Sequence, residues 1–260
     1  MHSKQAIDRL LTQLIADCPY THFLSLPLPT FHSSLDSFRA TVLASFPTAA
    51  GLHPSIFVRP TSLHFTVAML TLPTAHHVQR AAAALTSVAV PMSDGGFSVR
   101  LCGLAVMNER PEAAHVLYIQ PDDVSQQRLS ELAGRLVGVM RQAGVLSDSE
   151  VRKQRLMQRD RLTGEEAVSV KWHCTVMNTK HRRRGGHDTG TNSTAAQTEG
   201  GGGGRRGQGW NKRQAVDVSG VLAQYGDLDW GEGAVNACEL SALSWDNKTN
   251  FYPCEAKLPL

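Results

Sequence analysis

Apolar residues along the chain recur with two different spacings, and the spacing separates helices from strands. Recurrence at every third or fourth position predicts amphipathic helices at 7–15, 31–46, 74–88 and 129–144. Compact or alternating apolar runs predict strands at 21–28, 63–72, 98–107, 115–120, 168–177, 237–245 and 251–258. Some neighbouring strands are joined as hairpins rather than through helices, so the pattern favours the α+β class with largely antiparallel sheets.

One stretch, from His181 to Gly209, offers almost no large apolar residues to a core. It contains the arginines Arg182 to Arg184, a run of five glycines and mostly polar residues between them. Burial cannot offset the entropy of ordering such a composition. We therefore expect a single domain over residues 1–260, interrupted at 181–209 by a disordered, basic, glycine-rich insertion. The insertion would be either an arm that contacts a phosphate backbone or a loop without a specific role.

The formal net charge of +3 gives the whole chain no strong attraction to nucleic acid or to a membrane. Affinity for a phosphate-bearing ligand would therefore come from a local site. Lys4 and Arg9 stand among helically spaced apolar residues, which indicates an amphipathic helix rather than a signal peptide. No apolar run approaches the roughly 20 residues that a membrane span requires, so we expect no membrane partner.

The five cysteines are odd in number, widely scattered and without C-x-x-C spacing. They indicate reduced thiols in a protein of the nucleus, the cytoplasm or both, rather than a disulfide framework. No group of histidines, cysteines and carboxylates has the spacing of a metal site, and no phosphate-cradling glycine loop opens a helix. The sequence therefore predicts neither a metal nor a cofactor.

Two predicted strands in different halves of the chain carry the same short motif, LHFTV at 63–67 and WHCTV at 172–176. Side chains alternate between the two faces of a strand. His64 and Thr66 must then share one face, as must His173 and Thr175, while the apolar neighbours occupy the other. Two such strands side by side would place two imidazoles and two hydroxyls around one cleft.

This arrangement suits the chemistry of a phosphodiester. A neutral imidazole can take a proton from an attacking hydroxyl or water, and a protonated one can deliver a proton to the leaving oxygen. Histidine fits both roles because its ordinary pKa of about 6.5 keeps both forms accessible near neutral pH. Threonine hydroxyls can donate hydrogen bonds to the phosphoryl oxygens. The motif pair leaves open which histidine is the base and which the acid.

Other His-x-Ser/Thr triplets begin at His32, His53 and His187. None has apolar residues on both sides of the histidine, so none has the two-faced pattern of a strand. For one H-x-T motif alone, a histidine that simply bonds a neighbouring backbone group would be the simpler interpretation. The repetition of the motif in both halves favours a functional pair.

The remaining chemical candidates have structural explanations. His76 and His77 are adjacent on a predicted helix and point in different directions, which is typical of surface histidines. Asp122 and Asp123 stand at a helix start, where capping accounts for carboxylates. Four aromatic residues could stack on a base or equally pack in the core, namely Trp230, Trp245, Phe251 and Tyr252.

The paired H-x-T strands resemble the 2H phosphoesterase superfamily, which includes the bacterial 2′,5′ RNA ligase-like proteins. More narrowly, the chain is similar to the phosphoesterase domain shared by A-kinase anchor protein 7 and the activating signal cointegrator 1 complex subunit 1. The second motif and the MNT that follows it are nearest to the cointegrator subunit. The matching stretches are THFLSLPL at 21–28, LHFTVAMLTL at 63–72, WHCTVMNT at 172–179 and CELSALSWDNKTNFYPCE at 238–255.

The resemblance implies a bilobal, LigT-like α+β fold. Two related antiparallel sheets would face each other across a central cleft, with helices outside. It places His64, Thr66, His173 and Thr175 at the catalytic positions of a metal-independent 2H-type phosphodiesterase, a hydrolase that needs no cofactor. The implied substrates carry a phosphodiester next to a ribose, such as 2′,5′-linked oligonucleotides, 2′,3′-cyclic phosphates or RNA ends.

The cointegrator resemblance also implies a nuclear coactivator complex as a partner, in transcription and DNA repair. The alternative function is accordingly a non-catalytic RNA- or nucleotide-binding subunit of such a complex. About 20 residues precede the first matching strand, so we expect no KH RNA-binding module. No amphipathic helix follows the last strand, so we expect no kinase anchoring.

Overall fold

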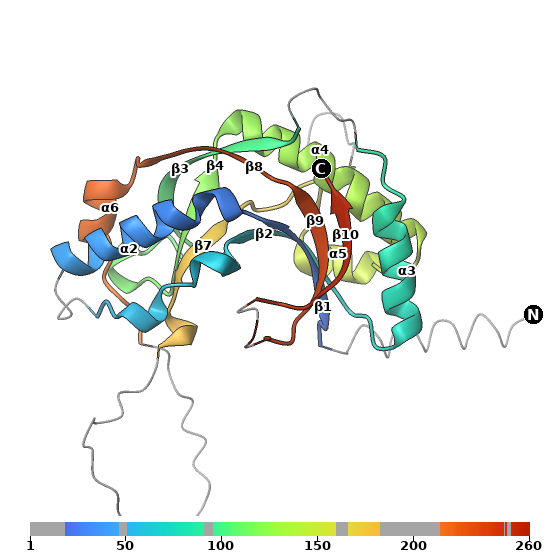
Figure 1. The fold of residues 1–260 in the computed structure, drawn as a ribbon, viewed down its shortest axis with the longest axis horizontal. Coiled ribbons are helices and arrows are strands. Elements are labelled where there is room, and N and C mark those ends of the chain that lie inside the picture. Colours follow the sequence, from blue (N-terminus) through green and yellow to red (C-terminus); the bar gives the residue numbers. More distant parts are fainter. Residues whose placement is uncertain are drawn as a thin grey trace, which may run out of the picture.

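The computed structural model describes residues 19–46, 51–90, 96–159, 166–182, 214–246, 248 and 251–260. The helix predicted at 7–15 and nearly all of the insertion predicted at 181–209 lie outside these residues. The centre of the molecule is an eight-stranded sheet (Figure 1). In spatial order its strands are β10 (Cys254–Pro259), β9 (Ala237–Ala242), β1 (His22–Pro27), β2 (His64–Leu70), β7 (Cys174–Asn178), β4 (Val116–Pro121), β3 (Ser98–Val106) and β8 (Asp229–Ala234).

The sheet consists of two four-stranded halves, β10-β9-β1-β2 and β7-β4-β3-β8, and every pairing in it is antiparallel. The halves meet through one pair of residues, Phe65 of β2 and Cys174 of β7, and both side chains are fully buried. The α+β class with antiparallel halves is thus confirmed. The two predicted sheets are joined edge to edge at this pair, so the described strands of both halves form one sheet.

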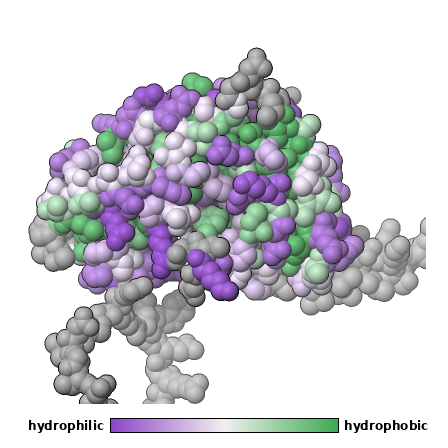
Figure 2. Space-filling view, viewed as in Figure 1, coloured by the Kyte–Doolittle hydropathy of each residue, from purple (hydrophilic) through white to green (hydrophobic). Residues whose placement is uncertain are grey.

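The helices are α2 (His32–Ser45), α3 (Ala75–Thr86), α4 (Asp123–Gln142), α5 (Asp148–Gln154) and α6 (Ser219–Tyr225). In Figure 1, α2 and α6 lie on the left and α3 on the right, and α4 runs from above β4 toward the right. In the same view, Figure 2 shows hydrophilic residues over much of this face, with hydrophobic patches between them. Among the described helices, none is long and apolar enough to cross a membrane.

Local sequence sets where the helices begin. Asp122 accepts the backbone N–H of Ser125 at the start of α4, and Thr74 accepts that of His77 at the start of α3. Both accept backbone N–H groups that a first helical turn leaves unpaired, as the sequence predicts for Asp122. Ser147 and Glu150 form a reciprocal capping box at α5, a helix that the apolar spacing does not predict because it has only seven residues.

The predicted strand at 168–177 is wrong as one element. Its first residue belongs to β6 (Glu166–Val168), which pairs with β5 (Met157–Arg159) in a separate two-stranded sheet, and its last part is β7. Residues 169–173 between them are not strand. The sequence pattern does not reveal the break between the two strands. Trp172 lies between them and belongs to neither, but it is buried like an inward-facing strand residue.

β8 is a strand that the sequence pattern misses, because its two glycines have low strand propensity. It forms at the edge of the sheet, where β3 supplies backbone partners. Gly233 is needed there for space, since a Cβ at this position would lie 2.7 Å from the ring of Phe31. Trp230 of the same strand is buried and packs on Phe38. Of the two roles considered for this tryptophan, core packing rather than base stacking is therefore correct.

Candidate functional site

The two H-x-T motifs lie side by side where the halves of the sheet meet. Phe65 pairs with Cys174 in antiparallel register. In that register His64 falls opposite Thr175, and Thr66 falls opposite His173. Because Phe65 and Cys174 point into the core, these four flanking side chains share the other face of the sheet. The histidines therefore stand on a diagonal, each beside the threonine of the other strand.

Both histidines are held by the same local hydrogen bond. The Nδ1 of His64 lies 2.7 Å from the carbonyl oxygen of Ser62, and the Nδ1 of His173 lies 2.7 Å from that of Lys171. A carbonyl oxygen only accepts, so each Nδ1 must carry the hydrogen. In the neutral ring, Nε2 is then left as a proton acceptor, and in the charged ring it is a proton donor.

His64 is enclosed by aromatic rings. Its ring centroid lies 5.4 Å from that of Phe23, 6.1 Å from that of Phe251 and 6.4 Å from that of Tyr252. Burial lowers the pKa of His64; the bond to the Ser62 carbonyl opposes this, and the nearby charge of His173 adds to it. The effect of His173 indicates that the two imidazoles are close enough to interact. The surroundings of His64 thus favour its neutral form.

His173 has a different neighbourhood, immediately before β7. Its ring packs edge-on against Tyr118 of β4, with the centroids 5.8 Å apart. The Nζ of Lys171 lies over the ring of the same tyrosine, 5.6 Å from its centroid. Directly behind, Trp172 is buried, donates from Nε1 to the hydroxyl of Ser130 and packs on Phe65. These contacts fix the backbone from which His173 projects.

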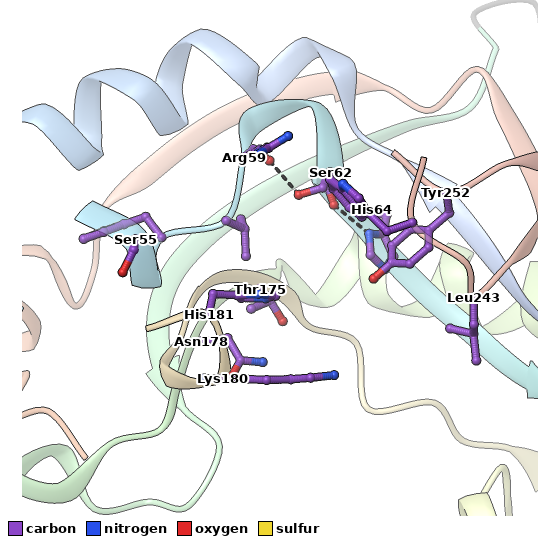
Figure 3. A pocket seen from close by; sticks show the side chains of 13 residues that line it. Ser55, Arg59, Ser62, His64, Thr175, Asn178, Lys180, His181, Leu243 and Tyr252 are labelled. Atoms are coloured by element: carbon purple, nitrogen blue, oxygen red, sulfur yellow. Dashed lines mark hydrogen bonds between the residues drawn. The ribbon is translucent and has the colours of Figure 1, made fainter. Parts of the chain in front are cut away.

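A pocket of about 580 Å³ opens beside the histidines. It is lined by Ser55, Phe57, Val58, Arg59, Ser62, His64, Thr175, Asn178, Lys180, His181, Leu243, Trp245 and Tyr252. In Figure 3, Ser55 lies at one end of it and Leu243 and Tyr252 at the other, with His64 and Thr175 between them. Of the four predicted catalytic residues, His64 and Thr175 therefore line the pocket. Thr66 and His173 are their partners across the strand pair and are not among the lining residues.

One end of the pocket has an aromatic wall. Trp245 is 39% exposed, and Tyr252 packs edge-on against it with the centroids 5.4 Å apart. The guanidinium of Arg59 lies 5.5 Å from the centroid of the Trp245 ring, a distance typical of a cation–π contact. An exposed tryptophan beside a cation offers a surface on which a nucleobase can stack.

The described residues that line the pocket include positively charged side chains and no carboxylate. Arg59 comes from the segment before β2, and Lys180 and His181 come from the short helix Thr179–His181 directly after β7. Asn178 caps this helix, with its side-chain oxygen accepting the backbone N–H of Lys180. Figure 3 shows the Lys180 side chain stretched along the opening of the pocket. Such a lining favours an anionic ligand.

These additional pocket residues were not predicted from the sequence. Arg59, Lys180 and His181 lie in turns with no periodic pattern, and only the pairing of strands brings them together. One signal was available, since Asn178 and Lys180 directly follow the second H-x-T motif. Among the described residues, no group of three or more histidines, cysteines and carboxylates is placed to hold a metal ion.

Residues 20–260 match the family described as the AKAP7 2′5′ RNA ligase-like domain. A curated relative, the activating signal cointegrator 1 complex subunit 1 of Mus musculus, is 29% identical over 190 residues. The match covers 70% of this chain and 48% of the relative, so the chain spans about half the length of the curated relative it matches.

Two solved structures share the fold. The protein TT0787 of Thermus thermophilus superposes with a TM-score of 0.54 at 16% identity, covering 92% of this chain and 97% of that one. LigT of E. coli, in a crystal structure complexed with ATP, gives a TM-score of 0.51 at 15% identity, covering 94% and 99%. At this identity the likeness shows the fold alone, and it confirms the LigT-like architecture that the resemblance implies.

Proposed function

The chain belongs to the family of AKAP7 2′5′ RNA ligase-like domains, within the 2H phosphoesterases, and we propose that it is a metal-independent phosphodiesterase. Its substrate would be an RNA-type, cyclic or 2′,5′-linked nucleotide phosphodiester. The observation that carries the proposal is the antiparallel pairing of Phe65 with Cys174, which sets both H-x-T motifs on one face beside a positively charged pocket. His64, Thr66, His173 and Thr175 are the catalytic residues in this proposal.

The two histidines divide the proton transfers. Because burial lowers the pKa of His64 and so favours its neutral form, its Nε2 accepts the proton of the attacking water or ribose hydroxyl. The protonated His173 then delivers a proton from its Nε2 to the leaving oxygen. Each transfer is typically worth about 10²–10⁴-fold in rate. The Thr66 and Thr175 hydroxyls donate to the non-bridging phosphoryl oxygens, where charge is concentrated in the transition state.

The pocket supplies binding on both sides of the reacting phosphate. The aromatic wall at Trp245 and Tyr252 accepts a base by stacking, which supports a nucleotide substrate rather than a simple phosphate ester. LigT, a structural neighbour, has been crystallised with 3′-AMP and with ATP, which supports the same class of ligand.

The test is turnover of 2′,5′-oligoadenylates and 2′,3′-cyclic nucleotides in the presence of EDTA, with analysis of the products. We expect activity in the wild type and losses of about 10²–10⁴-fold in kcat for His64→Ala and for His173→Ala. His76→Ala, at an exposed position on α3, is the matched control and should retain activity. Full activity in either active-site variant, with its fold intact by circular dichroism, would exclude the mechanism.

A second candidate function is favoured by the match to the cointegrator complex subunit. In this proposal the chain is a non-catalytic RNA- or nucleotide-binding subunit of a nuclear complex in transcription or DNA repair. The discriminating result is salt-dependent RNA binding that survives the loss of both histidines, together with no turnover of 2′,5′-oligoadenylates or 2′,3′-cyclic nucleotides. Nuclear localisation and co-purification with a large complex would then be expected as well.

A further inference from the structure

A second cavity of about 360 Å³ adjoins the first. It is lined by Arg39, His53, Pro54, Ser55, Phe57 and Arg59. Three of these residues, Ser55, Phe57 and Arg59, also line the first pocket, so the two cavities are direct neighbours. The described residues that line the second cavity include basic side chains and no carboxylate.

His53 in this cavity is held in the opposite tautomer to the two H-x-T histidines. The backbone N–H of Ser55 donates to the Nδ1 of His53 at 3.1 Å, so in the neutral ring Nδ1 carries no hydrogen. The hydrogen is then on Nε2, and His53 is a hydrogen-bond donor rather than a base. Its exposed ring offers that donor to whatever occupies the cavity. The hydroxyl of Ser55 also lies 2.7 Å from the Nδ1 of His53, so Nε2 is the ring nitrogen that can donate to a ligand.

Arg39 supplies the charge. It is a half-buried residue of α2, and within the part of the chain that the structure describes no ion pair joins it to a carboxylate. A guanidinium presents several N–H donors in a planar fork that matches the oxygens of a phosphate. Arg39 and His53 therefore bring donors from two separate elements, α2 and the segment before β2, to one cavity.

We propose that the cavity of Arg39, His53 and Ser55 binds a second phosphate of a single-stranded oligonucleotide whose scissile phosphate lies at the two H-x-T histidines. This inference rests on the proposed function for the position of the scissile phosphate. Tyr252 of the aromatic wall and Ser55 lie at opposite ends of the first pocket in Figure 3, with His64 between them. A strand with one base on the wall would then extend past Ser55 into the second cavity. The second cavity would thus favour an oligonucleotide with additional phosphates over a cyclic mononucleotide.

The experiment measures binding of fluorescein-labelled 2′,5′-linked oligoadenylates of two and of four residues by fluorescence anisotropy. His173→Ala serves as the background, so that the ligand is not consumed. We expect the tetramer to bind on the order of tenfold more tightly than the dimer at low salt, because it places an extra phosphate in the second cavity. Arg39→Gln should remove most of this advantage and leave the affinity for the dimer unchanged.

Salt dependence gives an independent readout. Each phosphate contact in a single strand contributes about 0.7 to the slope of log K against log salt concentration. Arg39→Gln should reduce the slope for the tetramer by about that amount, and Arg39→Lys, which keeps the charge, should restore it. His53→Ala should weaken binding of the tetramer more than binding of the dimer. It should reduce the slope less than Arg39→Gln does. Arg152→Gln, at an exposed position on α5, is the control and should change neither quantity.

Two outcomes would overturn the proposal. One is equal affinity for dimer and tetramer in the His173→Ala background, and the other is an Arg39→Gln effect of the same size on both ligands. A wrong proposed function would give a different result. The wild type would then turn over none of the ligands, while the tetramer would still bind more tightly than the dimer.

Discussion

The half of the sheet that carries His64 and the half that carries His173 hold their histidines in the same way but surround them differently. In each half the Nδ1 is bonded to the carbonyl two residues earlier, at 2.7 Å, and the strand continues with a threonine two residues later. The ring of His64 is then enclosed by aromatic neighbours on β1 and in the segment before β10. The ring of His173 contacts Tyr118 and has the cation of Lys171 nearby.

The shared bond places the hydrogen of each neutral ring on Nδ1 and leaves Nε2 as the acceptor, while the aromatic burial around His64 favours the neutral form of that ring. A fold made of two similar halves would by itself give two equivalent histidines. Acid–base catalysis needs two inequivalent ones, because one must accept a proton while the other delivers it. The aromatic enclosure of His64, which lowers its pKa, supplies the inequivalence.

The largest effect should come from removing both histidines together. If His64 and His173 act on one phosphorus atom, each single alanine variant already loses the concerted transfer. The double variant should then lose about as much as the more damaged single variant, within roughly tenfold, because residues that act as a unit are not additive. The measurement is kcat/KM for the four proteins on one 2′,5′-linked substrate. Losses that multiply would instead indicate that the histidines act independently.

Smaller losses should separate the two threonines. Valine keeps the volume of threonine but removes the hydroxyl donor. Thr175 lines the pocket and Thr66 does not, so Thr175→Val should lower kcat on the order of a hundredfold and Thr66→Val by about tenfold. Thr86→Val, at an exposed position on α3, is the control. Equal losses at Thr66 and Thr175 would mean that the phosphate lies symmetrically between the strands, and no loss at either would remove both from the catalytic set.

How far the sequence predicts this site depends on where each residue lies. The H-x-T motifs were predictable because each lies in or directly before a strand with one apolar face, and a period of two assigns His64 and His173 to the opposite face. The repeat of the motif predicts that the two strands lie side by side. The sequence alone does not identify Phe65 and Cys174 as the pair that joins β2 to β7. The catalytic role of the four residues stays a prediction.

Residues outside periodic segments could not be predicted in the same way. Trp230 and Trp245 gave the same sequence signal, yet the first is buried against α2 and the second lines the pocket. The difference arises because Trp230 belongs to a strand covered by a helix, whereas Trp245 follows the end of β9. Lys180 likewise reaches the pocket only because the helix that carries it follows β7 directly. Tertiary placement of turns decides these positions, and spacing does not encode it.

The smallest effect concerns the pH dependence of kcat/KM, which reports the pKa of the essential base in the free enzyme. A base works only when unprotonated, so activity falls as the pH drops through its pKa. Because burial lowers the pKa of His64, the acidic limb of the wild-type profile should lie below the ordinary value of 6.5. Phe251→Ser should admit water beside the ring, raise the pKa of His64 and move the limb modestly to higher pH. Phe97→Ser, directly before β3, is the control and should leave the limb in place; a limb that does not move in Phe251→Ser would contradict the assignment of His64 as the base.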